Sequence, residues 1–165
     1  MKKNIIIAIL MTIVVGAVIA IKINNAPMTA VESIADGIKS RNADKIIKYV
    51  DFERLRGNLK DRMKTQMEKD ASMSPMGKRM VAGLGDIILD NMLRTHVSET
   101  GLRKNLEDPQ KVKKFDGDIP TGKLTDENTY IVVIKKGKED MTIILKKYGL
   151  FDWKVTDIEL PSMRR

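Results

Sequence analysis

Carboxylates are the side chains of this 165-residue chain whose spacing could support catalysis. Asp86 and Asp90 lie one helical turn apart, and such a pair could divide the acid and base roles of a hydrolase or an isomerase. Asp116 and Asp118 flank a glycine, but a loop this short cannot supply all the ligands of a calcium ion. The same spacings are typical of the solvent-facing side of a helix and of a turn, and we favour that interpretation.

Asp51 interrupts an apolar run in the stretch YVDFERLRGNLK, residues 49–60. It could be catalytic, or it could accept the first backbone N–H bonds of a helix. The apolar residues that follow recur at steps of three and four: Phe52, Leu55, Leu59, Met63 and Met67. This periodicity predicts a helix that starts directly after Asp51, so we interpret the acid as an N-cap.

The sequence contains few residues that could bind a transition metal or act as a catalytic nucleophile. The chain contains one histidine, His96, and no cysteine, which excludes disulfides, thiolate catalysis and cysteine-bound zinc. We place His96 near the end of a helix, where an imidazolium would interact favourably with the helix dipole. The sequence contains no nucleophile elbow, phosphate-binding glycine loop or zinc-protease motif. We therefore predict no catalytic residue, no metal and no cofactor.

Methionines concentrate in two helices predicted for the middle of the chain: Met63, Met67, Met73, Met76, Met80 and Met92. They either fill a soft core or line an adaptable apolar groove for a lipid tail or a partner helix. Where helices pack on a sheet, an apolar pocket can form between the layers. We predict that its lining would include Met76, Met80, Tyr130 and Trp153.

Helix-start residues precede the apolar-periodic segments, in the order Pro27, Asn42 or Asp44, Asp51, Ser74 and Ser98. The second of these helices is expected to run through Ile46, Ile47, Tyr49 and Val50. The helix after Ser74 has an apolar stripe made of Met76, Met80, Leu84, Ile87, Ile88 and Met92.

After Pro120 the segments TYIVVIKK, MTIILKKY and FDWKVTDIEL are β-branched and aromatic, and turn sequences separate them. They predict an antiparallel meander, with a fourth strand around GKLTD. A bulge near Thr156–Asp157 would return Ile158 to the face that carries Trp153 and Val155. The fold class is therefore α+β, a helical segment packed on a C-terminal antiparallel sheet of three to four strands.

Residues 5–21 form an uncharged apolar run between Lys3 and Lys22. As a helix the run spans roughly 26 Å, which is close to the thickness of a bilayer core. The excess of positive charge before it predicts a cytoplasmic N-terminus and an exported C-terminal domain. The alternative is a signal peptide, with Val18 and Ala20 as its cleavage site. We expect an anchor or signal peptide with a short linker in residues 1–26, one exported domain in 27–161 and a basic tail in 162–165.

The formal net charge of +8 comes from interleaved charges rather than blocks, and aromatic residues make up only 4% of the chain. Such a surface offers no platform for stacking bases, so we predict no nucleic-acid partner.

Three segments resemble a bacterial family known only as a domain of unknown function: NADKIIKYVDFERLRGNLKDRM, HVSETGLRKNL and YGLFDWKVTDIELP. The resemblance extends from Pro27 to Pro161 and is sharpest from Ala43 to Lys60, although family members often have proline in place of Glu53. It implies a membrane segment followed by a small exported domain, and it implies no activity. More generally, the closing strand resembles the last strand of cystatin-like, nuclear-transport-factor-like domains.

The function stays unknown from sequence alone. We favour a non-enzymatic binding or protein-interaction module of the bacterial envelope, held in the inner membrane by a single N-terminal helix with its domain in the periplasm. Its partners would be the membrane, a lipid or small apolar ligand, and an envelope protein. The alternatives are a periplasmic protein released by cleavage and a cystatin-like hydrolase or isomerase that uses clustered carboxylates.

Overall fold

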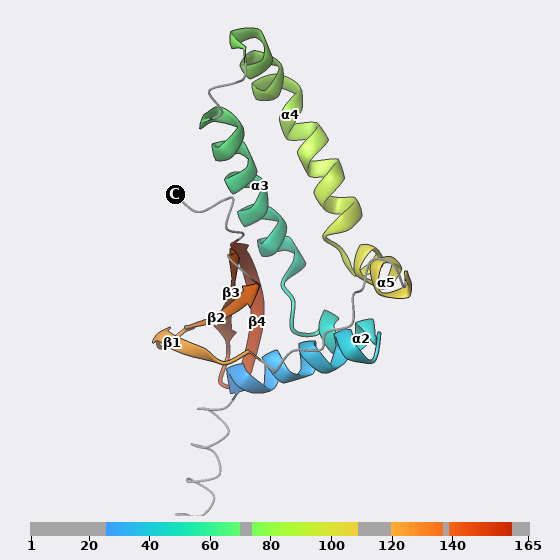
Figure 1. The fold of residues 1–165 in the computed structure, drawn as a ribbon, viewed down its shortest axis with the longest axis vertical. Coiled ribbons are helices and arrows are strands. Elements are labelled where there is room, and N and C mark those ends of the chain that lie inside the picture. Colours follow the sequence, from blue (N-terminus) through green and yellow to red (C-terminus); the bar gives the residue numbers. More distant parts are fainter. Residues whose placement is uncertain (1–25, 70–73, 109–119, 137–138, 160–165) are drawn as a thin grey trace, which may run out of the picture.

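The computed structural model describes residues 26–69, 74–108, 120–136 and 139–159 (Figure 1). The helices come first: residues 26–39, α2 (Ala43–Ile47), α3 (Phe52–Lys69), α4 (Pro75–His96) and α5 (Glu99–Glu107). The strands follow: β1 (Gly122–Asp126), β2 (Thr129–Lys136), β3 (Glu139–Tyr148) and β4 (Asp152–Glu159). The predicted α+β class is confirmed.

None of the helices within the described residues is both long and apolar enough to cross a bilayer. The predicted membrane segment, residues 5–21, lies outside the described residues.

Local side-chain bonds start the short helices where the sequence predicts. The Asn42 side chain accepts hydrogen bonds from the backbone N–H groups of Asp44 and Lys45, and so caps α2. The Ser98 hydroxyl accepts a bond from the N–H of Gly101 at 3.0 Å and caps α5. The predicted Ser98 cap is confirmed, and of the two candidates for α2 the cap is Asn42 rather than Asp44.

The four strands form one antiparallel sheet in the order β1-β2-β3-β4. Along β4, Val155 pairs with Leu145 but Asp157 pairs with Ile144, so Thr156 is the extra residue of a bulge. Beyond the bulge, Ile158 returns to the face that carries Trp153 and packs against the same core. The predicted bulge is therefore confirmed.

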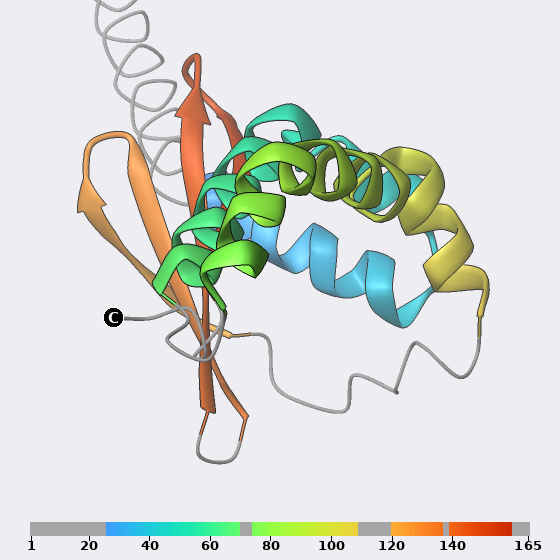
Figure 2. The ribbon, with the colours of Figure 1, turned by 90° about the horizontal axis from the view of Figure 1, so that it is seen from above.

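The main core lies between the helix of residues 26–39 and one face of the sheet, and Figure 2 shows the helices on one side of the strands. Its buried residues are Ala30, Val31, Tyr130, Val132, Leu145, Trp153 and Val155. A second cluster of Ala43, Ile46 and Leu106 joins α2 to α5. The 26–39 helix contacts both clusters through Ile34.

Residues 49–51 pair with the outer edge of β4 instead of continuing α2. The N–H of Val155 donates to the carbonyl of Tyr49 at 2.8 Å, and the N–H of Asp51 donates to the carbonyl of Val155 at 2.9 Å. The prediction that Tyr49 and Val50 belong to the second helix is wrong, because their backbone groups are used by a parallel bridge to the sheet. This bridge covers an edge that would otherwise expose unpaired backbone groups.

The helix α3 runs along β4 and is fixed to it by polar side chains. The Asn58 amide donates to the carbonyl of Thr156 at 2.9 Å. One turn further, the Arg62 guanidinium binds the carboxylates of Asp157 and Glu159. Burial alone would lower the pKa of Arg62, but the bond to Glu159 and the charge of Asp157 outweigh burial and raise it.

The helices α3 and α4 form a hairpin that extends beyond the sheet (Figure 1). On α4, Leu89 and Leu93 are buried, whereas Leu84, Ile87 and Ile88 are exposed, the last by 64%. The stripe that the spacing predicts on α4 is therefore not the face that packs within the chain. Lysines on α3 bind the acids of α4 and help to turn that other face inward.

Candidate functional site

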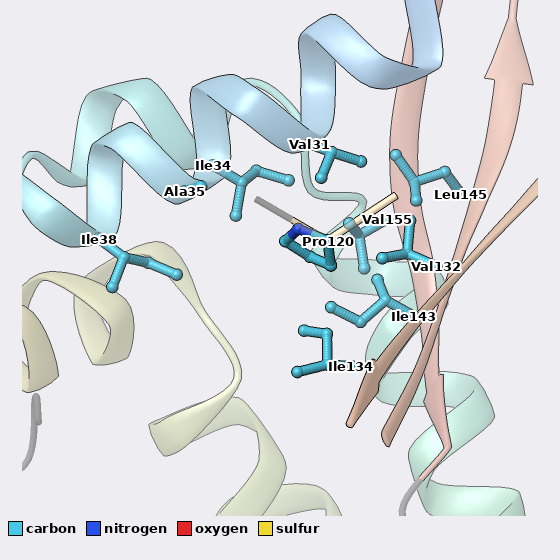
Figure 3. Close-up of a pocket in the computed structure, with 10 residues that line it drawn as sticks. All are labelled: Val31, Ile34, Ala35, Ile38, Pro120, Val132, Ile134, Ile143, Leu145 and Val155. Carbon is cyan, nitrogen blue, oxygen red and sulfur yellow. The ribbon is translucent and has the colours of Figure 1, made fainter. Parts of the chain in front are cut away.

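An apolar pocket of about 60 Å³ lies between the helix of residues 26–39 and the core face of the sheet. It is partly open to solvent. Its lining residues are Val31, Ile34, Ala35 and Ile38 from the helix, Val132, Ile134, Ile143, Leu145 and Val155 from the sheet, and Pro120 ahead of β1. Figure 3 shows the helix side chains and the strand side chains pointing toward the same space.

Residues at regular helix and strand spacings form the two walls of the pocket. The helix residues recur at steps of three and four and therefore share one face. On the sheet, Val132 and Ile134 are two residues apart on β2, so their side chains lie on the same face. Val132 pairs with Ile143 of β3, so these two side chains are neighbours on that face. Ala35 is the smallest side chain of the lining and leaves room between larger neighbours.

Among the residues that the structure describes, no ionisable or hydrogen-bonding side chain lines this pocket. These lining residues offer no acid, base, nucleophile or ligand atom for a metal. What it can do is remove hydrocarbon from water, which is favourable in proportion to the apolar area buried.

Of the four residues predicted to line a pocket, the structure brings Tyr130 and Trp153 together. Tyr130 and Trp153 are buried in the main core, and their rings meet edge-to-face with centroids 6.3 Å apart. Met76 is 74% exposed on α4, and the side chain of Met80 lies outside the described part of that helix. Met76, Tyr130 and Trp153 do not line the pocket described above, and ligand binding by the four residues stays a prediction.

The predicted lining contained methionine and aromatic residues, because methionine side chains adapt readily to ligands, and the pocket was therefore missed. The lining residues are aliphatic, and their spacing in the sequence is the same as that of any helix face or strand face packed in a core. The signal that could have pointed to it is the small Ala35 among isoleucines and valines on the core stripe of the 26–39 helix.

Asp86 and Asp90 lie in ion pairs between α3 and α4. Asp86 binds Lys64 at 2.9 Å, Asp90 binds Arg94 at 2.6 Å, and Lys60 lies within 4.0 Å of both acids. The bond from Lys64 lowers the pKa of Asp86, and the bond from Arg94 lowers the pKa of Asp90. A general acid would need a raised pKa, so neither carboxylate is suited to that role, and both act as counter-charges to lysine and arginine side chains. Asp116 and Asp118 lie outside the described residues.

Asp51 caps α3, as the sequence predicts. One carboxylate oxygen accepts the N–H of Arg54 at 3.0 Å, and the other accepts the hydroxyl proton of Tyr148. Burial would raise the pKa of Asp51, but the bonds from Tyr148 and Arg54 and the charge of Lys154 outweigh burial and lower it. Burial and the bond to Asp51 raise the pKa of the Tyr148 phenol. The Tyr148 hydroxyl therefore keeps its proton and donates it in a hydrogen bond to Asp51.

His96 is the last residue of α4 and is exposed, which confirms its predicted place at a helix end. In the part of the chain that the structure describes, no three histidine or acidic side chains gather in a group that could hold a metal ion.

Residues 14–104 match a family model described as "Protein of unknown function (DUF2939)". The match covers more than half of the chain. The chain belongs to this family. In this DUF2939 protein the matched region contains the 26–39 helix and α2 to α4, and it ends within α5. The sheet lies beyond it, so the matched region provides only the helical wall of the pocket.

Searches of the curated proteins and of the solved structures found no match. The resemblance of the closing strand to cystatin-like domains therefore stays a prediction. The description of the DUF2939 family assigns no activity, and none is transferred to this chain.

Proposed function

We propose that this DUF2939 protein is a non-enzymatic binding module of the bacterial envelope that takes the hydrocarbon part of a ligand into its apolar pocket. The observation that carries the proposal is the lining of the pocket, in which ten residues present no polar side chain. A pocket of this kind can bind an apolar group, because burying that group releases water from both surfaces.

The proposed location is the inner membrane, with the folded domain on the periplasmic side. Its support is the apolar run of residues 5–21 with its preceding lysines, together with the resemblance to membrane-anchored exported proteins. A cleaved signal peptide would export the same domain and leave it free in the periplasm.

Cysteine labelling tests the topology, because the natural chain has no cysteine to interfere. Glu127→Cys lies at the exposed turn between β1 and β2, and Lys3→Cys precedes the apolar run. We expect a maleimide that cannot cross the inner membrane to label the Glu127→Cys chain in intact cells and the Lys3→Cys chain only after lysis. Labelling with the opposite pattern would contradict the proposed orientation.

Mass spectra of the full-length protein test both cleavage and binding. A denatured mass near 18.6 kDa means an intact chain, and a loss of about 2 kDa or more means cleavage. We expect the native spectrum of protein extracted from membranes to show an added mass that disappears on denaturation. If the native and denatured masses agree across mild extraction conditions, the protein retains no ligand and the binding proposal is weakened.

The carboxylate-enzyme alternative has less support. It requires at least two acids in one cleft with perturbed pKa values of opposite sense. Asp86 and Asp90 are instead both shifted downward by their cationic partners.

A further inference from the structure

The size of the pocket limits what can enter it. Its volume of about 60 Å³ is less than half of the roughly 150 Å³ cavity in which benzene binds in another protein. A six-membered ring would therefore have to displace a wall. The end of an unbranched hydrocarbon chain is only one methylene wide and can enter without such a displacement.

The walls also select for saturated hydrocarbon. Ile34 and Ile38 point from the helix toward the space that Ile134 and Ile143 border on the sheet side (Figure 3). The described lining residues include no aromatic side chain, so a ring would find no face or edge among them to stack on. A polar group placed there would lose its bonds to water without replacement, so the polar end of a ligand stays outside.

We propose that the pocket takes the methyl end of a straight acyl chain, in preference to a ring-bearing ligand, while the carboxylate or headgroup remains in solvent. This inference rests on the proposed function and specifies its ligand. Two sources could supply the same chemistry, a free fatty acid or a membrane lipid. The helix that carries four lining residues follows the apolar run of residues 5–21 closely in sequence, so a membrane anchor would keep acyl chains nearby.

Trp153 provides a built-in reporter for this inference. It is the only tryptophan of the chain, and it belongs to the same packed cluster as four lining residues: Val31, Val132, Leu145 and Val155. Bromine quenches indole fluorescence only at short range. A bromine atom carried into the pocket on the end of a chain would therefore quench Trp153.

The experiment uses the full-length chain in phospholipid nanodiscs and three brominated probes. These are ω-bromododecanoate, with bromine on the terminal carbon, α-bromododecanoate, with bromine beside the carboxylate, and bromobenzene. We expect ω-bromododecanoate to quench Trp153 strongly and the other two probes to quench it weakly.

Pocket-filling variants connect the quenching to the pocket. Ile134→Phe fills the space from β2, and Val133→Phe is its control, because Val133 is the preceding residue on the same strand and is exposed. We expect Ile134→Phe to bind ω-bromododecanoate about tenfold or more weakly, since overpacking the site removes the room for the chain. The control should bind like the natural chain. Ala35→Leu, with Glu32→Leu as its control, repeats the test from the helix wall if Ile134→Phe fails to fold.

A second arm separates the two sources of the acyl chain. Nanodiscs are prepared with a phospholipid whose acyl chain carries bromine at its terminal carbon, and no fatty acid is added. Pocket-dependent quenching in these discs assigns the chain to a membrane lipid. Quenching by ω-bromododecanoate alone assigns it to a free fatty acid.

Four results would overturn the inference. Equal quenching by the α- and ω-bromo acids, or quenching that survives in both pocket-filling variants, would show that the chain end is not in the pocket. Pocket-dependent quenching by bromobenzene but not by ω-bromododecanoate would refute the acyl ligand and leave the apolar binding module standing. If no probe quenches Trp153 in a pocket-dependent way, the inference and the proposed function both fail.

Discussion

At Asp51 a single carboxylate accepts a backbone N–H from the first turn of α3 and a phenolic proton from Tyr148 at the end of β3. The same residue donates its own N–H to β4. The start of α3 and the last two strands, which are distant from α3 in the sequence, therefore meet at one residue. This explains why the stretch around Asp51 has such a distinctive pattern without invoking catalysis.

The charge of Asp51 should make the stability of the domain depend on acid pH. Because its folded-state pKa is lowered, its contribution is fully present above the unfolded pKa of about 3.9 and is lost as the pH falls through the folded value. We expect Asp51→Asn to lower the free energy of unfolding at neutral pH, and the difference from the natural chain to shrink below about pH 4. Urea unfolding followed by Trp153 fluorescence measures this. A difference that stays constant with pH would show that the charge of Asp51 contributes nothing.

Arg62 is the counter-charge for Asp157, which is only 7% exposed, and for Glu159. We expect Arg62→Met to lower the free energy of unfolding by about 1–3 kcal/mol, because a largely buried carboxylate would lose its partner while some water still reaches the site. Arg103→Met is the matched control, since the pair of Arg103 with Asp44 is exposed and should matter little. Equal effects of the two substitutions in urea unfolding would refute this account.

At the scale of elements, the orientation of α4 is the least expected feature. Its aliphatic stripe faces solvent, whereas Leu89 and Leu93 are buried and the acids of the helix form ion pairs with Lys60 and Lys64 of α3. Leaving large apolar side chains exposed is unfavourable, so specific contacts between the two helices must select this orientation.

Two neighbouring positions test that orientation. Leu89 is 5% exposed and Ile88 is 64% exposed, so the same truncation to alanine should have very different effects. We expect Leu89→Ala to lower the free energy of unfolding by about 2–4 kcal/mol, because it leaves a cavity between the helices. Ile88→Ala should change it by about 0.5 kcal/mol or less. If Ile88→Ala is as harmful as Leu89→Ala in thermal or urea unfolding, another surface covers the stripe.

At the scale of the whole molecule, one packed cluster joins the 26–39 helix to three strands of the sheet. Trp153 lies in this cluster and is 3% exposed, whereas Phe151 just before β4 is 44% exposed. The molecule therefore depends on the closing strand for the packing of its first described helix.

Removing the Trp153 ring should weaken the entire domain. We expect Trp153→Ala to lower the free energy of unfolding by about 3–5 kcal/mol, because it empties the centre of the core. Phe151→Ala, with an exposed ring of similar kind, should have a much smaller effect. Circular dichroism during thermal unfolding measures both. Similar melting curves for the two variants would show that Trp153 does not hold the helix on the sheet.

Much of the local structure could be predicted from the sequence. The helix starts at Asp51 and Ser98, and the start at Asn42 or Asp44, are predictable because a cap bonds to backbone groups only two or three residues away. The bulge at Thr156 followed from a break in the alternation of one strand. The candidate site was not found, because its aliphatic lining has the same pattern as any packed core.

The sequence by itself determined the order of helices and strands, most of their starts and the alternation of the sheet, because these depend on interactions between near neighbours in the chain. Only the tertiary structure decided that Tyr49 and Val50 pair with β4, that α4 turns its aliphatic stripe outward, and that a pocket remains beside Ala35. Each of these outcomes depends on how surfaces distant in the sequence fit together, and the energies of such fits are set by packing and ion pairs that no local pattern specifies.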